Sequence, residues 1–89
     1  MITRTRPVSF PPSYPLERIG DPSQLLFFDI ETTGFSGDTS NLYLIGCVFQ
    51  ENNSWKLIQW FADTQESEAG LLSSFFTFFQ NYRILLHFN

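Results

Sequence analysis

Two carboxylates, Asp29 and Glu31, are the residues of this sequence best suited to chemistry. They follow an apolar run at residues 25–28 and are separated by a single residue. On a β-strand, residues two apart point to the same face, about 6.6 Å apart along the backbone. Two carboxylates held side by side at the buried end of a strand repel each other and lose hydration. A divalent cation offsets both effects, and hard oxygen ligands of this kind favour Mg²⁺ or Mn²⁺ over Zn²⁺.

A purely structural interpretation of the pair is also open. Asp29 and Glu31 would then be the solvated end of a strand, with Glu31 beside a lysine or an arginine. For an isolated Asp-x-Glu this interpretation is the simpler one. The Thr32, Thr33 and Gly34 that follow favour a functional site instead. Gly34 permits a tight turn in which backbone amides approach a phosphate.

The string at residues 27–34, Phe-Phe-Asp-Ile-Glu-Thr-Thr-Gly, resembles the first motif of the Asp-Glu-Asp-Asp family of 3′–5′ exonucleases, which have a ribonuclease H-like fold. Residues 43–47, the pair Trp60-Phe61, an acidic helix start and the closing residues 87–89 are similar to the YprB-type branch of bacterial ribonuclease H-like domains. The resemblance covers residues 25–89.

This resemblance implies a metal-dependent 3′–5′ exonuclease that hydrolyses the phosphodiester backbone of DNA or RNA. In such proteins the first Asp bridges two Mg²⁺ or Mn²⁺ ions and the Glu completes one site, which are the positions of Asp29 and Glu31. The implied nucleic-acid-binding residues are Thr32, Thr33, Gly34, Phe35 and Asn89. The amides around the two threonines meet the 3′ end, and Phe35 packs against the terminal base.

The second catalytic aspartate of that family lies a few residues beyond the position of Asn89, and the third motif follows later. Two-metal cleavage needs both cations about 3.5–4 Å apart, and two carboxylates do not hold that pair. We therefore interpret residues 23–89 as the N-terminal portion of a larger domain, and we expect the 89-residue chain itself to be inactive. The alternatives are a catalytically inactive nucleic-acid-binding or interaction remnant, and an unrelated α+β module.

Apolar patterning predicts three strands, a helix and a fourth strand, at 25–30, 42–49, 55–61, 66–82 and 84–88. The connection at 50–54 predicts a hairpin, so the second and third strands are antiparallel. A strand after a helix can lie parallel to the first strand through a right-handed crossover. The fold class is therefore α/β, ribonuclease H-like and partial. We expect a central first strand with both carboxylates at its carboxyl end.

The predicted helix has Asp63 or Thr64 as its cap. Four residues at i, i+3, i+4 and i+7 predict its core-facing stripe: Leu72, Phe75, Phe76 and Phe79. Leu71 and Phe78, seven residues apart, widen this apolar face. Cys47 is expected to be a small buried residue. His87 is expected to be an ordinary strand residue without a catalytic role.

All five prolines lie within residues 1–22. Each proline removes a hydrogen-bond donor and fixes φ, so this segment is predicted to be an extended arm without a regular helix or a central strand. The arm is either anchored to the domain by Phe10, Tyr14 and Leu16 or disordered.

Composition limits the class of protein. Hydrophobic residues make up 43% of 89 residues, which excludes an intrinsically disordered chain. The net charge of −4 argues against binding nucleic acid by charge alone, but not against meeting phosphate through metal ions. No apolar run reaches the ~18 residues of a membrane span, and the N-terminus lacks a signal-peptide pattern. A cytoplasmic location is expected.

Overall fold

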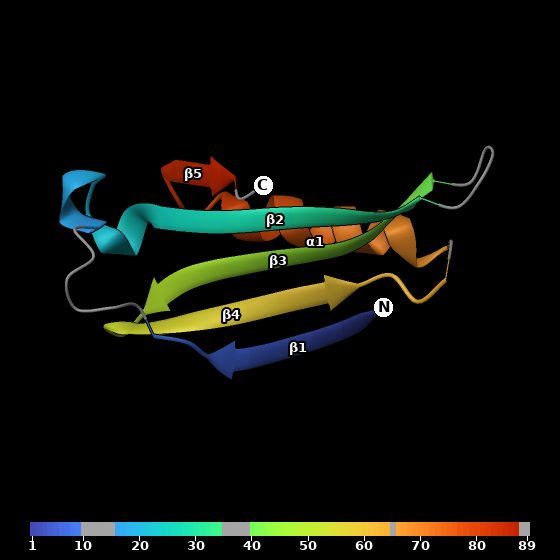
Figure 1. The fold of residues 1–89 in the computed structure, drawn as a ribbon, viewed down its shortest axis with the longest axis horizontal. Helices are drawn as coiled ribbons and strands as arrows, with labels where there is room; N and C mark the ends of the chain where they lie inside the picture. Colours follow the sequence, from blue (N-terminus) through green and yellow to red (C-terminus); the bar gives the residue numbers. More distant parts are fainter. Residues whose placement is uncertain (10–15, 35–39, 65, 88–89) are drawn as a thin grey trace.

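The computed structural model describes residues 1–9, 16–34, 40–64 and 66–87. Its strands form one sheet, and helix α1 covers one face of that sheet (Figure 1). In chain order the elements are β1 (Ile2–Pro7), the short 3-10 turns η1 (Leu16–Arg18) and η2 (Pro22–Gln24), β2 (Leu25–Gly34), β3 (Ser40–Glu51), β4 (Ser54–Phe61), α1 (Ser67–Phe79) and β5 (Ile84–His87).

The strand order is β1-β4-β3-β2-β5. β2 is antiparallel to β3 and parallel to β5, and β3 is antiparallel to β4. The predicted meander, the helical crossover and the parallel return strand are therefore confirmed. β2, the first of the predicted strands, lies inside the sheet as expected.

β1 is the strand that the sequence did not predict. It pairs antiparallel with β4, from Ile2 opposite Phe61 to Pro7 opposite Lys56. Residues 2–7 are extended, as expected, but they form a strand of the sheet, and residues 16–18 form the 3-10 turn η1. A proline is tolerated there because β1 is an edge strand, and Pro7 lies at its end. Leu16, one of the three expected anchors, is only 6% exposed and packs in a cluster with Leu25 and Phe27. Phe10 and Tyr14 lie outside the described residues.

The hairpin between β3 and β4 is tighter than predicted. Glu51 pairs with Ser54, so the connection has two residues rather than five. Asn52 and Asn53 have φ of 53° and 63°. Asparagine tolerates this left-handed region, and two such residues match a type I′ turn, which suits the twist of the flanking strands.

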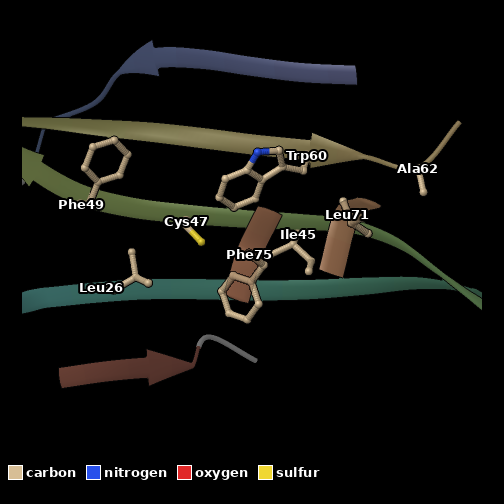
Figure 2. Packing of buried hydrophobic residues seen from close by; sticks show 8 residues of the cluster. All are labelled: Leu26, Ile45, Cys47, Phe49, Trp60, Ala62, Leu71 and Phe75. Atoms are coloured by element: carbon tan, nitrogen blue, oxygen red, sulfur yellow. The ribbon is translucent and has the colours of Figure 1, made fainter. Parts of the chain in front are cut away.

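Apolar side chains form two clusters, one on each face of the sheet. The cluster under α1 contains Leu26, Ile45, Cys47, Phe49, Trp60, Ala62, Leu71 and Phe75 (Figure 2). Cys47 is fully buried in this cluster, which confirms the expected role as a small buried residue, and this burial raises the pKa of its thiol to about 12. The cluster on the other face contains Leu16, Leu25 and Phe27. Successive residues of β2 therefore alternate between the helix-covered face and what we call the open face.

The apolar face of α1 packs on the sheet as predicted except at one residue. Leu71 and Phe75 are buried, whereas Phe76 is 50% exposed, so its place in the stripe was wrong. The reason is that α1 packs over β3 and β4. The ring of Phe78 meets Phe49 and Trp60 edge-on at 4.9 and 5.4 Å, which turns Phe76 away from the sheet.

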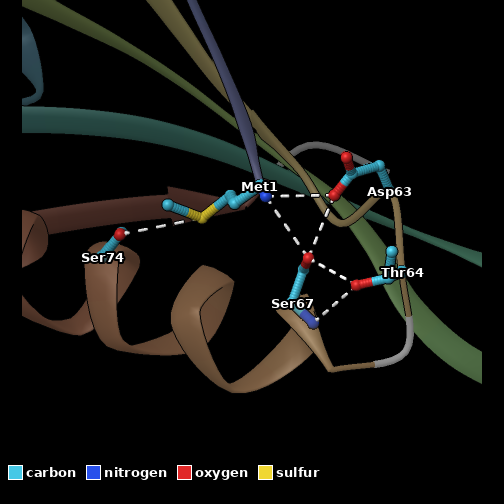
Figure 3. A network of polar contacts seen from close by, with 5 residues as sticks. All are labelled: Met1, Asp63, Thr64, Ser67 and Ser74. Carbon is cyan, nitrogen blue, oxygen red and sulfur yellow. Dashed lines mark hydrogen bonds and ion pairs between the residues drawn. The ribbon is translucent and has the colours of Figure 1, made fainter.

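A polar network joins the start of β1 to the start of α1 (Figure 3). The Met1 ammonium lies 3.0 Å from Asp63 Oδ1 and donates to Ser67 Oγ at 3.3 Å. Ser67 Oγ donates to Asp63 Oδ1 at 3.0 Å, and the Ser67 amide donates to Thr64 Oγ1 at 3.2 Å. The predicted cap was wrong, because the N-cap of α1 is Glu66, which makes no side-chain cap; Thr64 lies two residues earlier and accepts from the amide of Ser67. Hydrogen bonds from the ammonium and then from Ser67 lower the pKa of the Asp63 carboxyl.

The turn geometry predicts opposite effects of two substitutions. Asn53→Gly should stabilise the fold by up to about 1 kcal/mol, because glycine adopts positive φ without strain. Asn52→Ala should destabilise it by about 1 kcal/mol, because alanine is strained there. Urea unfolding monitored by tryptophan fluorescence measures both. Equal stability of the two variants would contradict the type I′ turn.

The lowered pKa of Asp63 predicts a pH-dependent contribution of the network. Because the folded pKa lies below the ordinary 3.8, the carboxylate stabilises the fold above that pH. The contribution is lost as the pH falls through the folded pKa. Asp63→Asn should therefore lower the melting temperature slightly at pH 7, and the difference from wild type should vanish in strong acid. A difference that persists there would contradict the assignment.

Candidate functional site

Asp29 and Glu31 lie on the open face of β2, opposite α1. Both line a single pocket of ≈190 Å³, together with Phe27, Leu44, Gly46, Val48, Leu57 and Gln59. Leu26 and Ile30, which alternate with them along the strand, pack against the cluster under the helix. The two carboxylates therefore share one face, as strand alternation predicts.

The position of the carboxylates along β2 is a correction. They were expected at the carboxyl end of the strand, but β2 continues to Gly34. Residues 32–34 find partners in the first part of β3, after a register shift between Glu31 and Thr32. Among the described residues, β5 pairs with β2 from Leu25 to Phe28, so the part of β2 that precedes Asp29 is flanked on both sides.

Burial of the pair is a second correction. Asp29 is half-buried, but Glu31 is exposed. Helix α1 covers the opposite face of the sheet, so Glu31 stays accessible to solvent although apolar side chains such as Phe27 and Val48 line the same pocket. The ion pairs among the described residues join Met1 to Asp63 and Lys56 to Glu51, so Glu31 is not beside a basic partner there.

The remaining predicted site residues are only partly placed. Thr32, Thr33 and Gly34 pair through their backbones with Leu42, Asn41 and Ser40. Gly34 thus ends a strand, and the turn expected there falls on residues outside the described ranges. Phe35 and Asn89 also lie outside those ranges. His87 stacks on Phe28, with ring centroids 4.9 Å apart, and serves packing at the edge of the sheet.

The sequence did not predict which residues lie across the sheet from Asp29. Gly46 of β3 lies opposite Asp29, and Gln59 of β4 lies opposite Gly46. A Cβ at Gly46 would meet the side chains of Gln59 and Leu57 at 3.8 Å, which is ordinary contact. The missing side chain at Gly46 therefore leaves space in the pocket, although an added Cβ there would not clash with its neighbours. Counting register outward from the Asn52-Asn53 turn is the signal that finds both residues.

The donor chemistry fits a hard divalent cation only in part. Two carboxylates on one accessible face are ligands of the kind that Mg²⁺ and Mn²⁺ prefer. In the described part of the chain, no group of three or more His, Cys, Asp or Glu residues is placed to hold a metal ion. The pair therefore provides part of a metal site, and further ligands would be needed for two ions.

Comparison with known proteins decides the family. A family model described as the RNase H superfamily matches residues 26–89, which begin within β2 and include both carboxylates. The chain belongs to the RNase H superfamily. This confirms the ribonuclease H-like fold class and gives a nuclease-like hydrolase acting on nucleic acid as the general function. Nucleases of the RNase H superfamily generally use divalent metal ions. Searches of curated proteins and of solved structures found no match.

The described residues also bear on a membrane location. No helix among them has both the length and the apolar character that crossing a bilayer requires.

Proposed function

We propose that this protein is a metal-dependent 3′–5′ exonuclease domain of the YprB-type branch, with Asp29 and Glu31 as ligands of Mg²⁺ or Mn²⁺. One observation carries the proposal. Within the segment that matches the RNase H superfamily, the two carboxylates share the open face of β2 and line one pocket.

The two carboxylates have different surroundings and hence different roles in this proposal. Asp29 is half-buried beside Gly46 and provides the fixed ligand, whereas exposed Glu31 completes one ion's shell. When bound, Mg²⁺ or Mn²⁺ supplies positive charge against the phosphate oxygens and the leaving oxygen. Thr32, Thr33, Gly34, Phe35 and Asn89 are proposed to contact the 3′-terminal nucleotide. Among the described residues no third His, Cys, Asp or Glu joins the pair, so a two-ion site would need further ligands.

A catalytically inactive nucleic-acid-binding domain is the second candidate. The observation that favours it is the number of ligands, because the described residues bring only two carboxylates to the site. Such a domain would bind a cation and a nucleic acid strand but would leave the phosphodiester bond intact.

Metal binding tests the site without requiring activity. Calorimetric titration of the 89-residue chain with Mn²⁺ should detect weak binding. Asp29→Asn and Glu31→Gln should each weaken it about tenfold or more, because each removes a charged ligand from a pair. Glu66→Gln is the matched control, since Glu66 is exposed and makes no side-chain cap at α1. Equal Mn²⁺ affinity in wild type and Asp29→Asn would refute the assignment.

Activity separates the two candidates. In a protein that contains the complete domain, release of nucleotides from the 3′ end of labelled DNA and RNA should require Mg²⁺ or Mn²⁺. Asp29→Asn should lower it by more than about 100-fold, since even the outer partners of metal ligands contribute 10–100-fold. Mn²⁺ binding without any hydrolysis would favour the inactive domain.

A further inference from the structure

Two arginines of β1, Arg4 and Arg6, lie on the same open face as the carboxylates. Arg4 is opposite Gln59 and Arg6 is opposite Leu57 in the pairing of β1 with β4. Directly opposed residues of antiparallel strands project to the same side. Since Gln59 and Leu57 line the pocket of Asp29 and Glu31, the arginine side chains share that face.

The arginines continue a row that starts at Asp29. Across the sheet, Asp29 lies opposite Gly46, Gly46 opposite Gln59, and Gln59 opposite Arg4. In Figure 1, β2 and β1 lie on opposite sides of β3 and β4. Three steps between neighbouring strands amount to about 14 Å at ~4.8 Å each. The hollow beside Arg4, Thr5 and Arg6 also includes Gln59, so it adjoins the carboxylate pocket.

The charge of this edge differs from that of the whole protein. The net charge is −4, and only five residues are lysine or arginine. Lys56 is paired with Glu51, whereas no ion pair among the described residues involves Arg4 or Arg6, and both are exposed. A pair of exposed guanidinium groups is a ready binding site for phosphate, because each presents a fork of donors to its oxygens.

We propose that Arg4 and Arg6 bind neighbouring backbone phosphates of the nucleic acid strand whose 3′ end lies at Asp29 and Glu31. This inference rests on the proposed function and extends it to the substrate: a single strand long enough to reach from β2 to β1. Residues two apart on a strand are about 6.6 Å apart, comparable with the spacing of successive phosphates in an extended single strand. Gly46, which has no side chain, and the polar Gln59 lie between the carboxylates and the arginines and leave room there for a nucleic acid strand.

Protection of the sheet edge is the competing explanation for arginines on β1. Charged residues on an edge strand discourage pairing with another chain, and that role does not depend on which face the charge occupies. In β1 both arginines project to the open face, whereas Thr3 and Thr5 lie opposite Trp60 and Ile58, which pack in the cluster under α1. Both charges of β1 therefore lie on the face along which the nucleic acid strand is proposed to bind.

Fluorescence anisotropy with labelled single-stranded oligonucleotides tests the proposal. DNA and RNA probes are used in parallel, because the shared phosphodiester backbone is the expected ligand. EDTA is included so that metal ions contribute nothing to binding. The Arg4→Gln, Arg6→Gln double variant should bind at least about tenfold more weakly. Its slope of log K against log salt should fall by about 1.4, at ~0.7 for each lost phosphate contact on a single strand.

Three matched variants give the comparison. Arg18→Gln with Arg83→Gln removes the same charge outside β1 and should keep the wild-type salt slope. Arg4→Lys with Arg6→Lys keeps the charge and should keep the slope. Exchanging Thr3 with Arg4 and Thr5 with Arg6 keeps the composition of β1 but moves both charges to the other face, and it should weaken binding like the glutamine pair. Melting temperatures show whether each variant is folded. If a double variant is unfolded, the single variants Arg4→Gln and Arg6→Gln replace it, and each is expected to lower the salt slope by about 0.7.

The outcomes separate this inference from the proposed function. Wild-type binding that the glutamine pair leaves unchanged, or that the Arg18 and Arg83 pair weakens equally, would overturn the phosphate-binding role of β1 alone. Absence of binding to both DNA and RNA by the wild-type chain in EDTA would likewise overturn the inference but not the proposed function, which fails instead if Asp29→Asn keeps the wild-type affinity for Mn²⁺.

Discussion

Side chains along β2 alternate between the two faces of the sheet, and this alternation determines where the core and the candidate site lie. Leu26 and Phe28 project into the cluster under α1, while Phe27 and Asp29 project to the open face. A one-residue slip in pairing would reverse every side chain of the strand. The carboxylates would then enter the apolar core under the helix, where the loss of hydration opposes their charge. Burial of Leu26 therefore fixes the direction of Asp29 and Glu31.

The neighbouring strands carry this register outward to the edge of the sheet. Antiparallel pairing places Gly46, Gln59 and Arg4 in line with Asp29. β1 is kept in place by its antiparallel pairing with β4 and by the contacts of the Met1 ammonium with Asp63 and Ser67. An acidic protein thus presents two carboxylates and two guanidinium groups on one face, with opposite charges separated by uncharged residues.

How much of this the sequence predicted depends on the signal available at each residue. Long apolar runs predicted the strands β2 to β5 and the helix, because core burial dominates their patterning. β1 was missed because Ile2-Thr3-Arg4-Thr5-Arg6 contains one apolar residue and its pairing partner, β4, lies far along the chain. The exposure of Phe76 was missed because periodicity gives an apolar face but not which strands the helix crosses. The shared face of Asp29 and Glu31 followed from alternation alone, whereas the half-burial of one and the exposure of the other depend on tertiary packing.

Paramagnetic broadening by Mn²⁺ reports whether a cation binds on the open face of the sheet. Amide signals of the ¹⁵N-labelled chain are followed by NMR as Mn²⁺ is added below stoichiometry. If the cation binds at Asp29 and Glu31, the signals of Asp29, Gly46 and Gln59 should broaden first, while those of Ser73 and Thr77 on α1 persist. In Asp29→Asn, this preferential broadening of the open face should be lost. Broadening that begins around Asp63 and Glu66 at the start of α1, or that spreads evenly over the chain, would contradict binding at Asp29 and Glu31.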